Sequence, residues 1–392
     1  MTKRVIPPLC IGLVAALAVG PACSSDDDAV DPGLPAVTSS VPSTDPPTAD
    51  HDTSPDDEPG LGSILTPGPT THLGATWFSP PPTAAQDRIL ELWEEVEAAS
   101  SVGRVLIDWT DVEPAAGDRH FDELDESLGE IVASGRSPMV TLAAVDVSGT
   151  EFPEWLGEFE PDAAAAAYAS MIEDLLPVLR RHEVWLLAIA NEPPLADGED
   201  LARPDFATFV EGVTRRLDDI APDLPVTFTF AGGDPFIDDP AIQRMIDAVD
   251  AFSVNHYCLE QDLRTAPSTA TTARIDEVVK RAGDLPVVFQ EFGCPASESM
   301  GSSDEFQRDW FETAFAHIGS LERVRAAFVF EFLDWSPDTF DLDYGDSVDE
   351  LESLLGPDFV ERFRSWLLTS GLVRIDGTPR PAFELFIDVA SA

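Results

Sequence analysis

Short apolar runs alternate with amphipathic stretches along the chain from residue 71 onward. The runs consist mainly of Val, Leu, Ile, Ala and Phe, which is typical of strands buried on both faces of a parallel sheet. Between the runs, apolar residues recur at helical spacing, as in the helices predicted at 163–180, 206–220 and 306–315. The pattern predicts eight strands, at residues 73–78, 102–109, 139–145, 184–190, 226–230, 251–254, 287–289 and 326–330.

Eight strand–helix units in about 320 residues predict a closed α/β fold, a (β/α)8 TIM barrel that forms a single domain over residues 71–392. An open, doubly wound sheet is the alternative, but no glycine-rich phosphate loop follows the first strand. The carboxyl ends of barrel strands meet at one face, where active sites are built. We expect an acidic insertion at 341–369 to line one side of that face.

Residues 1–23 have the features of an export signal. Lys3 and Arg4 precede an apolar stretch at 11–19 that is too short to span a bilayer. The stretch leads into a Gly-Pro-Ala-Cys sequence that ends at Cys23 and is similar to a bacterial lipoprotein cleavage site, with Cys23 as the lipidated residue. A leucine is more usual where the glycine stands, and ordinary signal peptidase cleavage also fits. We therefore expect an exported cell-surface lipoprotein or, alternatively, a secreted protein.

Residues 24–70 are rich in Pro, Ser, Thr, Asp and Gly. Such a composition buries too little apolar surface to fold, so this stretch is predicted to be a disordered linker. The whole chain of 392 residues is strongly acidic, with 73 acidic residues against 23 basic ones and a formal net charge of −50. Such a charge repels phosphate backbones and excludes nucleic acid as a partner, but it does not oppose a neutral ligand such as a sugar polymer.

Two carboxylates stand at the ends of predicted strands. Asn191-Glu192-Pro193 ends the fourth strand, and Glu291 follows the seventh. A carboxylate placed directly after a buried strand is costly unless it has a partner or a purpose. Because both lie at the same mouth of a barrel, they can face each other across a substrate. Glycoside cleavage needs such a pair, one carboxyl to protonate the leaving oxygen and the other to attack the anomeric carbon.

These motifs resemble the clan of (β/α)8 retaining glycosidases known as the 4/7 superfamily, or clan A, which includes cellulase-like enzymes. The resemblance implies that Glu192 is the acid/base and Glu291 the nucleophile. The segments 104–117 and 371–382 are also similar to the strand-2 region and the C-terminal ending of such enzymes. The chain departs from the pattern at the end of the third strand, which has no histidine, and at Asn255, where many members have one.

The resemblance implies further roles around this pair. Asn191 would hydrogen-bond the sugar 2-hydroxyl, a contact that strengthens in the transition state. Tyr257 would donate to Glu291 and help to keep it ionised, and Arg104 would do the same through its charge. The structural alternatives are a core aromatic residue for Tyr257 and an ion-pair partner for Arg104.

Three aromatic residues are further candidates for contact with a sugar. Trp335, after the eighth strand, would provide a flat platform for a sugar ring, although packing alone also explains it. Trp109 and, as a secondary candidate, His256 are expected contacts at the rim, although a histidine in such a position is more often structural. The six histidines and the cysteines have no spacing that indicates a metal site, and glycoside cleavage needs no cofactor.

Cys258 and Cys294 follow the sixth and seventh strands. If those strands are neighbours, the two cysteines meet, and an oxidising compartment would join them in a disulfide. Two free buried thiols are the alternative. The sequence thus predicts a monomeric, retaining β-glycoside hydrolase, attached to a membrane only through a lipid anchor. A transglycosylase with the same residues and a non-catalytic carbohydrate-binding lipoprotein are the alternatives, and the sequence does not specify the sugar.

Overall fold

The computed structural model describes residues 63–392, apart from residues 67, 79, 147–151, 194–202 and 233–238. The predicted signal with Cys23, and the linker as far as residue 62, lie outside the described residues. Within the described residues, no helix is long and apolar enough to cross a membrane.

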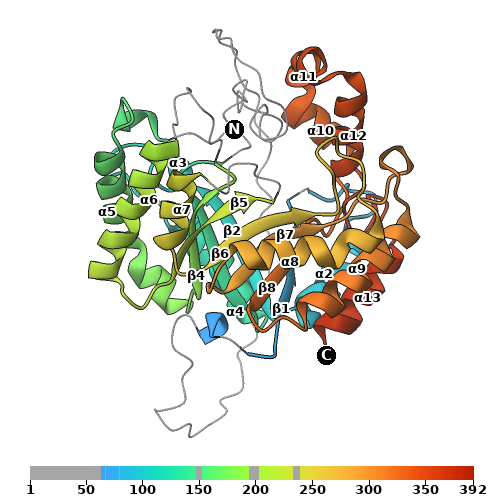
Figure 1. The fold of residues 1–392 in the computed structure, drawn as a ribbon, viewed down its shortest axis with the longest axis horizontal. Helices are drawn as coiled ribbons and strands as arrows, with labels where there is room; N and C mark the ends of the chain where they lie inside the picture. Colours follow the sequence, from blue (N-terminus) through green and yellow to red (C-terminus); the bar gives the residue numbers. More distant parts are fainter. Residues whose placement is uncertain (1–62, 67, 79, 147–151, 194–202, 233–238) are drawn as a thin grey trace, which may run out of the picture.

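The described residues form a barrel of eight parallel strands, in the order β1-β8-β7-β6-β5-β4-β3-β2 (Figure 1). This confirms the predicted (β/α)8 fold and excludes the open doubly wound sheet. The strands are largely buried, and β4 and β8 consist of apolar residues along nearly their whole length, as expected of parallel strands covered on both faces. Their bounds are β1 (His72–Ala75), β2 (Val102–Asp108), β3 (Ser137–Ala143), β4 (Leu186–Asn191), β5 (Val226–Ala231), β6 (Phe252–Tyr257), β7 (Val287–Gly293) and β8 (Val324–Val329).

The first and second strands close the barrel without a regular ladder between them. Ser101 N–H donates to the Leu73 carbonyl at 3.0 Å, and a side chain at Gly74 would lie only 2.5 Å from the Val102 carbonyl oxygen. The two backbones therefore approach too closely at this point for any residue larger than glycine. Among the described residues, the barrel is closed here by packing, this backbone hydrogen bond and a side-chain hydrogen bond between His72 and Ser101 rather than by paired strands.

Helices surround the strands on the outside, with α5, α6 and α7 on one side and α8, α9 and α13 on the other (Figure 1). Their buried faces are apolar. On α2 (Gln86–Ala99), for example, Ile89, Leu92 and Val96 are buried. The bounds are α2 (Gln86–Ala99), α3 (Trp109–Val112), α4 (Asp122–Ala133), α5 (Pro161–Arg181), α6 (Arg203–Ile220), α7 (Pro240–Asp247), α8 (Thr271–Arg281), α9 (Asp304–Ile318) and α13 (Pro381–Ala390). Short 3-10 helices are η3 (Glu154–Leu156), η4 (Ser268–Ala270) and η5 (Glu298–Met300).

A short segment before the first strand seals the amino-terminal end of the barrel. Its 3-10 helix η2 (Ser63–Leu65) buries Ile64 and Leu65 against residues that begin the strands, such as Met139 and Trp185. Arg325 fixes the segment by donating to the Ile64 carbonyl at 2.8 Å. The prediction of a linker as far as residue 70 is therefore wrong for these residues. Two apolar side chains are enough to anchor a segment that its overall composition marks as unstructured.

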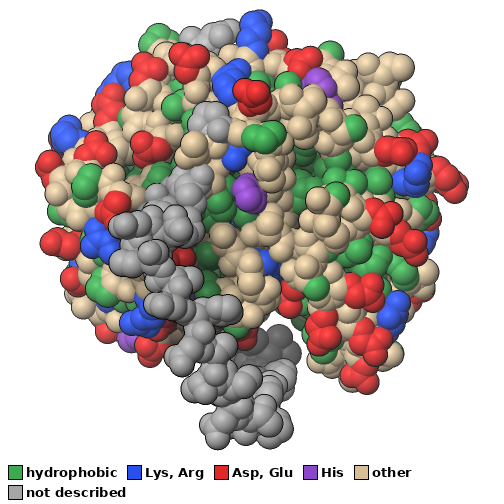
Figure 2. Space-filling view, turned by 90° about the horizontal axis from the view of Figure 1, so that it is seen from below, with side chains coloured by type: hydrophobic (Ala, Val, Ile, Leu, Met, Phe, Trp, Pro, Cys, Tyr) green, Lys and Arg blue, Asp and Glu red, His purple; other side chains and the backbone are tan. Residues whose placement is uncertain are grey.

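The acidic insertion forms a helical layer beyond the eighth strand, comprising α10 (Pro337–Tyr344), η6 (Gly345–Ser347), α11 (Val348–Leu355) and α12 (Pro357–Leu367). These helices lie together at one edge of the barrel (Figure 1). Arg362 joins the layer to the loop after β6 by donating to the Asp262 carbonyl at 2.6 Å. Acidic side chains are spread over the surface seen in Figure 2, with basic ones between them, in keeping with the net charge.

Candidate active site

The two predicted glutamates lie at the carboxyl ends of their strands, and both are almost fully buried. Glu192 comes directly after β4 and is 6% exposed, and Glu291 lies within β7 and is 7% exposed. Glu192 has a φ of 43°, a left-handed conformation that costs energy for a residue with a side chain. Its N–H is held by the Thr229 carbonyl at 2.8 Å, which stabilises this sharp turn of the chain.

Glu291 is surrounded by donors. Arg104 Nη2 lies 3.5 Å from Oε1 of Glu291, and the Tyr257 hydroxyl donates to Oε2. Burial raises the pKa of the Glu291 carboxyl, while the charge of Arg104 and the hydrogen bond from Tyr257 lower it. Both carboxylate oxygens thus have a partner that favours the ionised form, and the roles of Tyr257 and Arg104 in catalysis stay predictions.

Glu192 is in a different electrostatic environment. Burial raises the pKa of its carboxyl well above the usual range, and the negative charge of Glu291 raises it further. A hydrogen bond from the Asn255 side chain and the charge of Arg104 act in the opposite direction, but they do not cancel these effects. Burial therefore raises the pKa of both carboxyls, that of Glu192 well above the usual range and that of Glu291 less, because Arg104 and Tyr257 favour the ionised form of Glu291.

A polar network beneath the two glutamates fixes their surroundings. Gln290 is fully buried, and its Oε1 accepts from the hydroxyls of Thr141 at 2.9 Å and Thr229 at 2.6 Å. Its Nε2 donates to Asn191 Oδ1 at 2.7 Å, and its backbone carbonyl accepts from Arg104 at 3.0 Å. The Gln290 side chain thus joins β3, β4 and β5 to β7, and its backbone carbonyl adds a link to β2.

Asn191 is fixed within this network rather than standing freely in the mouth of the barrel. Its Nδ2 donates to Asp146 Oδ2 at 2.9 Å, and its Oδ1 also accepts from Asn255 Nδ2 at 3.4 Å. Because an ionised carboxylate only accepts hydrogen bonds, Asp146 sets the direction of the Asn191 amide. Asp146 and Gln290 were not among the predicted site residues, although Asp146 directly follows the third apolar run, as the two glutamates follow theirs.

Trp335 lies after the eighth strand and is partly buried. Its indole N–H donates to Oε1 of Glu331 at 2.8 Å, and its ring stacks on Tyr344 with the centroids 6.2 Å apart. Its role as a sugar platform stays a prediction. Glu331, which directly follows the eighth predicted strand, was overlooked in the sequence because no motif includes it.

The two predicted rim residues lie in the interior. Trp109 is fully buried, its N–H donates to Glu113 Oε2 at 3.0 Å, and its ring packs edge-on against Tyr168. The rim position predicted for Trp109 is therefore wrong, because the short helix α3 turns its indole into the core. His256 borders the cleft, but its ring is buried against Phe292, and burial lowers its pKa to about 3, so it is neutral.

An open cleft of about 560 Å³ lies beside Glu192. It is lined by the end of β6, by the loop that follows this strand, and by Arg274 and Trp366. Trp366 belongs to α12, so the insertion does line one side, as the sequence predicts. Among the described residues, no group of three or more histidine, cysteine, aspartate or glutamate side chains could hold a metal ion.

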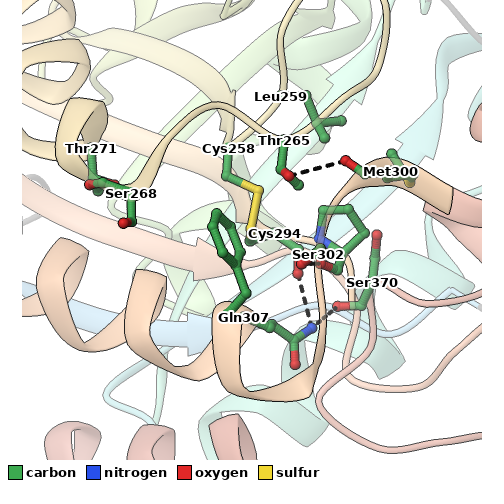
Figure 3. The surroundings of a disulfide bond; sticks show 12 residues. Cys258, Leu259, Thr265, Ser268, Thr271, Cys294, Met300, Ser302, Gln307 and Ser370 are labelled. Atoms are coloured by element: carbon green, nitrogen blue, oxygen red, sulfur yellow. Dashed lines mark hydrogen bonds between the residues drawn. A yellow bond between two sulfur atoms is a disulfide. The ribbon is translucent and has the colours of Figure 1, made fainter. Parts of the chain in front are cut away.

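Cys258 and Cys294 form the predicted disulfide, which joins the residue after β6 to the residue after β7 (Figure 3). The Cα atoms are 5.1 Å apart, and both cysteines are buried. The bond lies next to Tyr257 in the sequence and three residues after Glu291. It therefore links β6 and β7, the strands that carry Tyr257 and Glu291, whose side chains are hydrogen-bonded to each other.

Several solved structures with a similar fold carry the names of glycoside-cleaving enzymes. An exo-β-1,4-mannosidase from Opitutaceae bacterium strain TAV5 aligns at 17% identity and a TM-score of 0.60, over 82% of this chain and 59% of that one, so this chain spans less than two thirds of it. A GH5_18 protein from Bifidobacterium longum subsp. longum aligns at 15% identity and a TM-score of 0.60, over 82% and 79% of the two chains. The β-glycosidase BGL167 aligns at 15% identity and a TM-score of 0.54, over 84% and 91%.

No protein-family model and no curated protein sequence matches the chain. The fold is nevertheless a TIM barrel, which the chain shares with these solved structures. Similarity at this level of identity concerns the fold. Any activity must be argued from the side chains at the mouth of the barrel.

Removing the Tyr257 hydroxyl tests the environment of Glu291. In a Tyr257→Phe variant the pKa of Glu291 should rise, because a hydrogen bond to the charged form is lost. For Glu291 in the role of nucleophile proposed below, which requires the ionised form, activity should be lost at a pH about one unit higher on acidification, with kcat/KM about tenfold lower. The pH dependence of kcat/KM measures both. Tyr168→Phe, which removes a hydroxyl bonded to the Leu142 carbonyl, is the matched control and should leave the acidic limb in place.

Proposed function

We propose that the protein is a retaining β-glycoside hydrolase in which Glu192 is the acid/base and Glu291 the nucleophile. The observation that carries the proposal is that the two buried carboxyls have different hydrogen-bond partners and different shifts in pKa. Glu291 has Arg104 and Tyr257 on its two oxygens, whereas burial and the charge of Glu291 keep Glu192 protonated. Retaining glycosidases require this division of roles.

In the first step, an oxygen of Glu291 attacks the anomeric carbon while the proton of Glu192 passes to the departing glycosidic oxygen. The bond between the anomeric carbon and that oxygen breaks, and a covalent glycosyl–enzyme ester forms. Glu192 is then a carboxylate. Since Glu291 is now an uncharged ester, the repulsion between the two groups disappears, and the pKa of Glu192 falls to the value that a base needs.

In the second step, Glu192 removes a proton from water, and the water oxygen attacks the anomeric carbon. The ester bond to Glu291 breaks, and Glu291 leaves as a carboxylate that Arg104 and Tyr257 again stabilise. The sugar is released with its original anomeric configuration, and both residues return to their initial protonation states.

The configuration of the first product tests this proposal. The substrates are aryl β-glycosides of neutral sugars, which the negative net charge does not repel. We expect proton NMR to detect the β-anomer first, with the α-anomer appearing only through mutarotation. Immediate release of the α-anomer would mean inversion and would contradict a glycosyl–Glu291 intermediate. Adding sugar acceptors shows whether transfer to a sugar competes with transfer to water. Binding of these glycosides without turnover would favour the non-catalytic alternative.

Export as a lipoprotein is a second part of the proposal. Its support is the signal-like segment 1–23 with Cys23, together with the disulfide between Cys258 and Cys294, a bond typical of oxidising compartments. A Cys23→Ser variant should be released from the membrane fraction of its host. If the variant and the parent fractionate alike, Cys23 is not an anchor.

A further inference from the structure

A third buried carboxyl lies at the mouth of the barrel and has no part in the steps above. Glu331 comes two residues after β8 and is fully buried. Its φ of 67° is left-handed, a conformation that residues with side chains rarely adopt. Such strain persists only where the surroundings hold it, and it is common at functional sites.

The two oxygens of Glu331 have different partners. Oε1 accepts from the indole N–H of Trp335 at 2.8 Å, and Oε2 accepts from the backbone N–H of Phe78 at 3.4 Å. Phe78 follows β1 and Trp335 follows β8, so the carboxyl joins two loops on the side of the barrel where β1 and β2 lack a ladder. Without this acceptor, the Trp335 ring would keep its stacking on Tyr344, but its indole N–H would lose the hydrogen bond to Glu331.

Glu331 is uncharged at neutral pH. Burial raises the pKa of its carboxyl to about 8, although hydrogen bonds from Trp335 and Phe78 lower it, and the charges of Glu291 and Asp334 add to the rise. Asp334 itself is paired with Arg380 at 2.7 Å. A neutral acid can therefore accept the indole N–H close to the ionised Glu291 without placing a second negative charge there.

We infer that Glu331 is a positioning residue that holds the Trp335 ring in the orientation in which it contacts the sugar. This inference rests on the proposed function, since it assigns a sugar contact to Trp335. Glu331 itself acts through the indole ring and need not touch the substrate. Its loss should therefore weaken substrate binding more than it slows the chemical steps.

A set of four variants tests this inference. Glu331→Met removes both acceptors at similar volume, and Trp335→Phe removes the indole N–H but keeps a ring. Each should raise KM about tenfold while kcat changes less than about threefold, and the double variant should be no worse than either one. Glu331→Gln is the matched control, because its amide oxygen can still accept from the indole, and its KM should stay close to that of the parent. Thermal unfolding establishes that each variant is folded.

A readout independent of turnover separates this inference from the proposed function. The indole N–H resonance of Trp335, assigned by its absence in Trp335→Phe, should shift in Glu331→Met and hold its place in Glu331→Gln. The inference would be overturned if the resonance did not move in Glu331→Met. It would also be overturned if the effects of Glu331→Met and Trp335→Phe on KM multiplied in the double variant. If the resonance shifts but the parent hydrolyses no glycoside, the positioning of Trp335 stands and the proposed function fails.

Discussion

Replacing Glu291 by alanine is expected to lower kcat/KM for β-glycosides by on the order of 10⁴-fold or more, because no group remains to attack the anomeric carbon. The Glu192 proton alone cannot compensate, since protonation of the leaving oxygen leaves the developing positive charge without a partner. Initial rates on an aryl β-glycoside measure the loss. Glu298→Ala is the matched control, because Glu298 is exposed on η5 and should be replaceable at no cost.

Rescue of Glu291→Ala by azide tests whether the group that this variant lacks is the nucleophile. The side chain of alanine leaves space for a small anion, so azide should restore turnover of a substrate with a good leaving group in Glu291→Ala. Because azide then attacks from the face that the carboxylate used, the product should be the α-glycosyl azide. Parent-like activity in Glu291→Ala, or a β-glycosyl azide from it, would show that Glu291 is not the nucleophile.

Replacing Glu192 by glutamine is expected to produce a loss that depends on the leaving group. Glycosides with a poor leaving group need the proton and should lose about 10³-fold in kcat/KM, whereas dinitrophenyl glycosides should lose little in this first step. Hydrolysis of the glycosyl–enzyme should also slow, because no base activates water, so KM should fall as the intermediate accumulates. Steady-state kinetics across a series of leaving groups measures these effects, and equal losses across the series would contradict an acid role for Glu192.

The pH dependence of kcat/KM of the parent protein should report the ionisation of Glu192. Burial and the charge of Glu291 raise the pKa of Glu192 well above its usual range. The acid form is the active one in the first step, so kcat/KM is retained below that pKa and lost as the pH rises through it. In Glu192→Gln measured on a dinitrophenyl glycoside, the alkaline limb due to this group should disappear.

Much of the fold follows from local patterns. A strand buried on both faces must be apolar along its length, so β4 and β7 were predictable from residues 184–190 and 287–289 without any knowledge of their neighbours. The disulfide between Cys258 and Cys294 followed from the order of the strands. The composition of the segment did not predict η2. Its two apolar residues are buried only because they pack against the amino-terminal end of the barrel, which is formed by distant parts of the chain.

The site was predictable only in part. Glu192 and Glu291 stood out because each follows a buried strand within a short motif. Glu331 and Gln290 were missed because their roles depend on partners far away in the chain, Phe78 for the first and Thr141 for the second. Such hydrogen bonds leave no local pattern in the sequence.

By itself, the sequence determined the alternation of strands and helices, the barrel, and the two acidic residues at its mouth, because each depends on the periodicity of one segment or on the end of one strand. The tertiary structure alone decided how deeply the two glutamates are buried, and it turned Trp109 into the core rather than to the rim. The reason is physical: burial, charge and hydrogen-bond direction are set by atoms that the chain brings together from distant positions, and these quantities divide the roles of two chemically identical side chains.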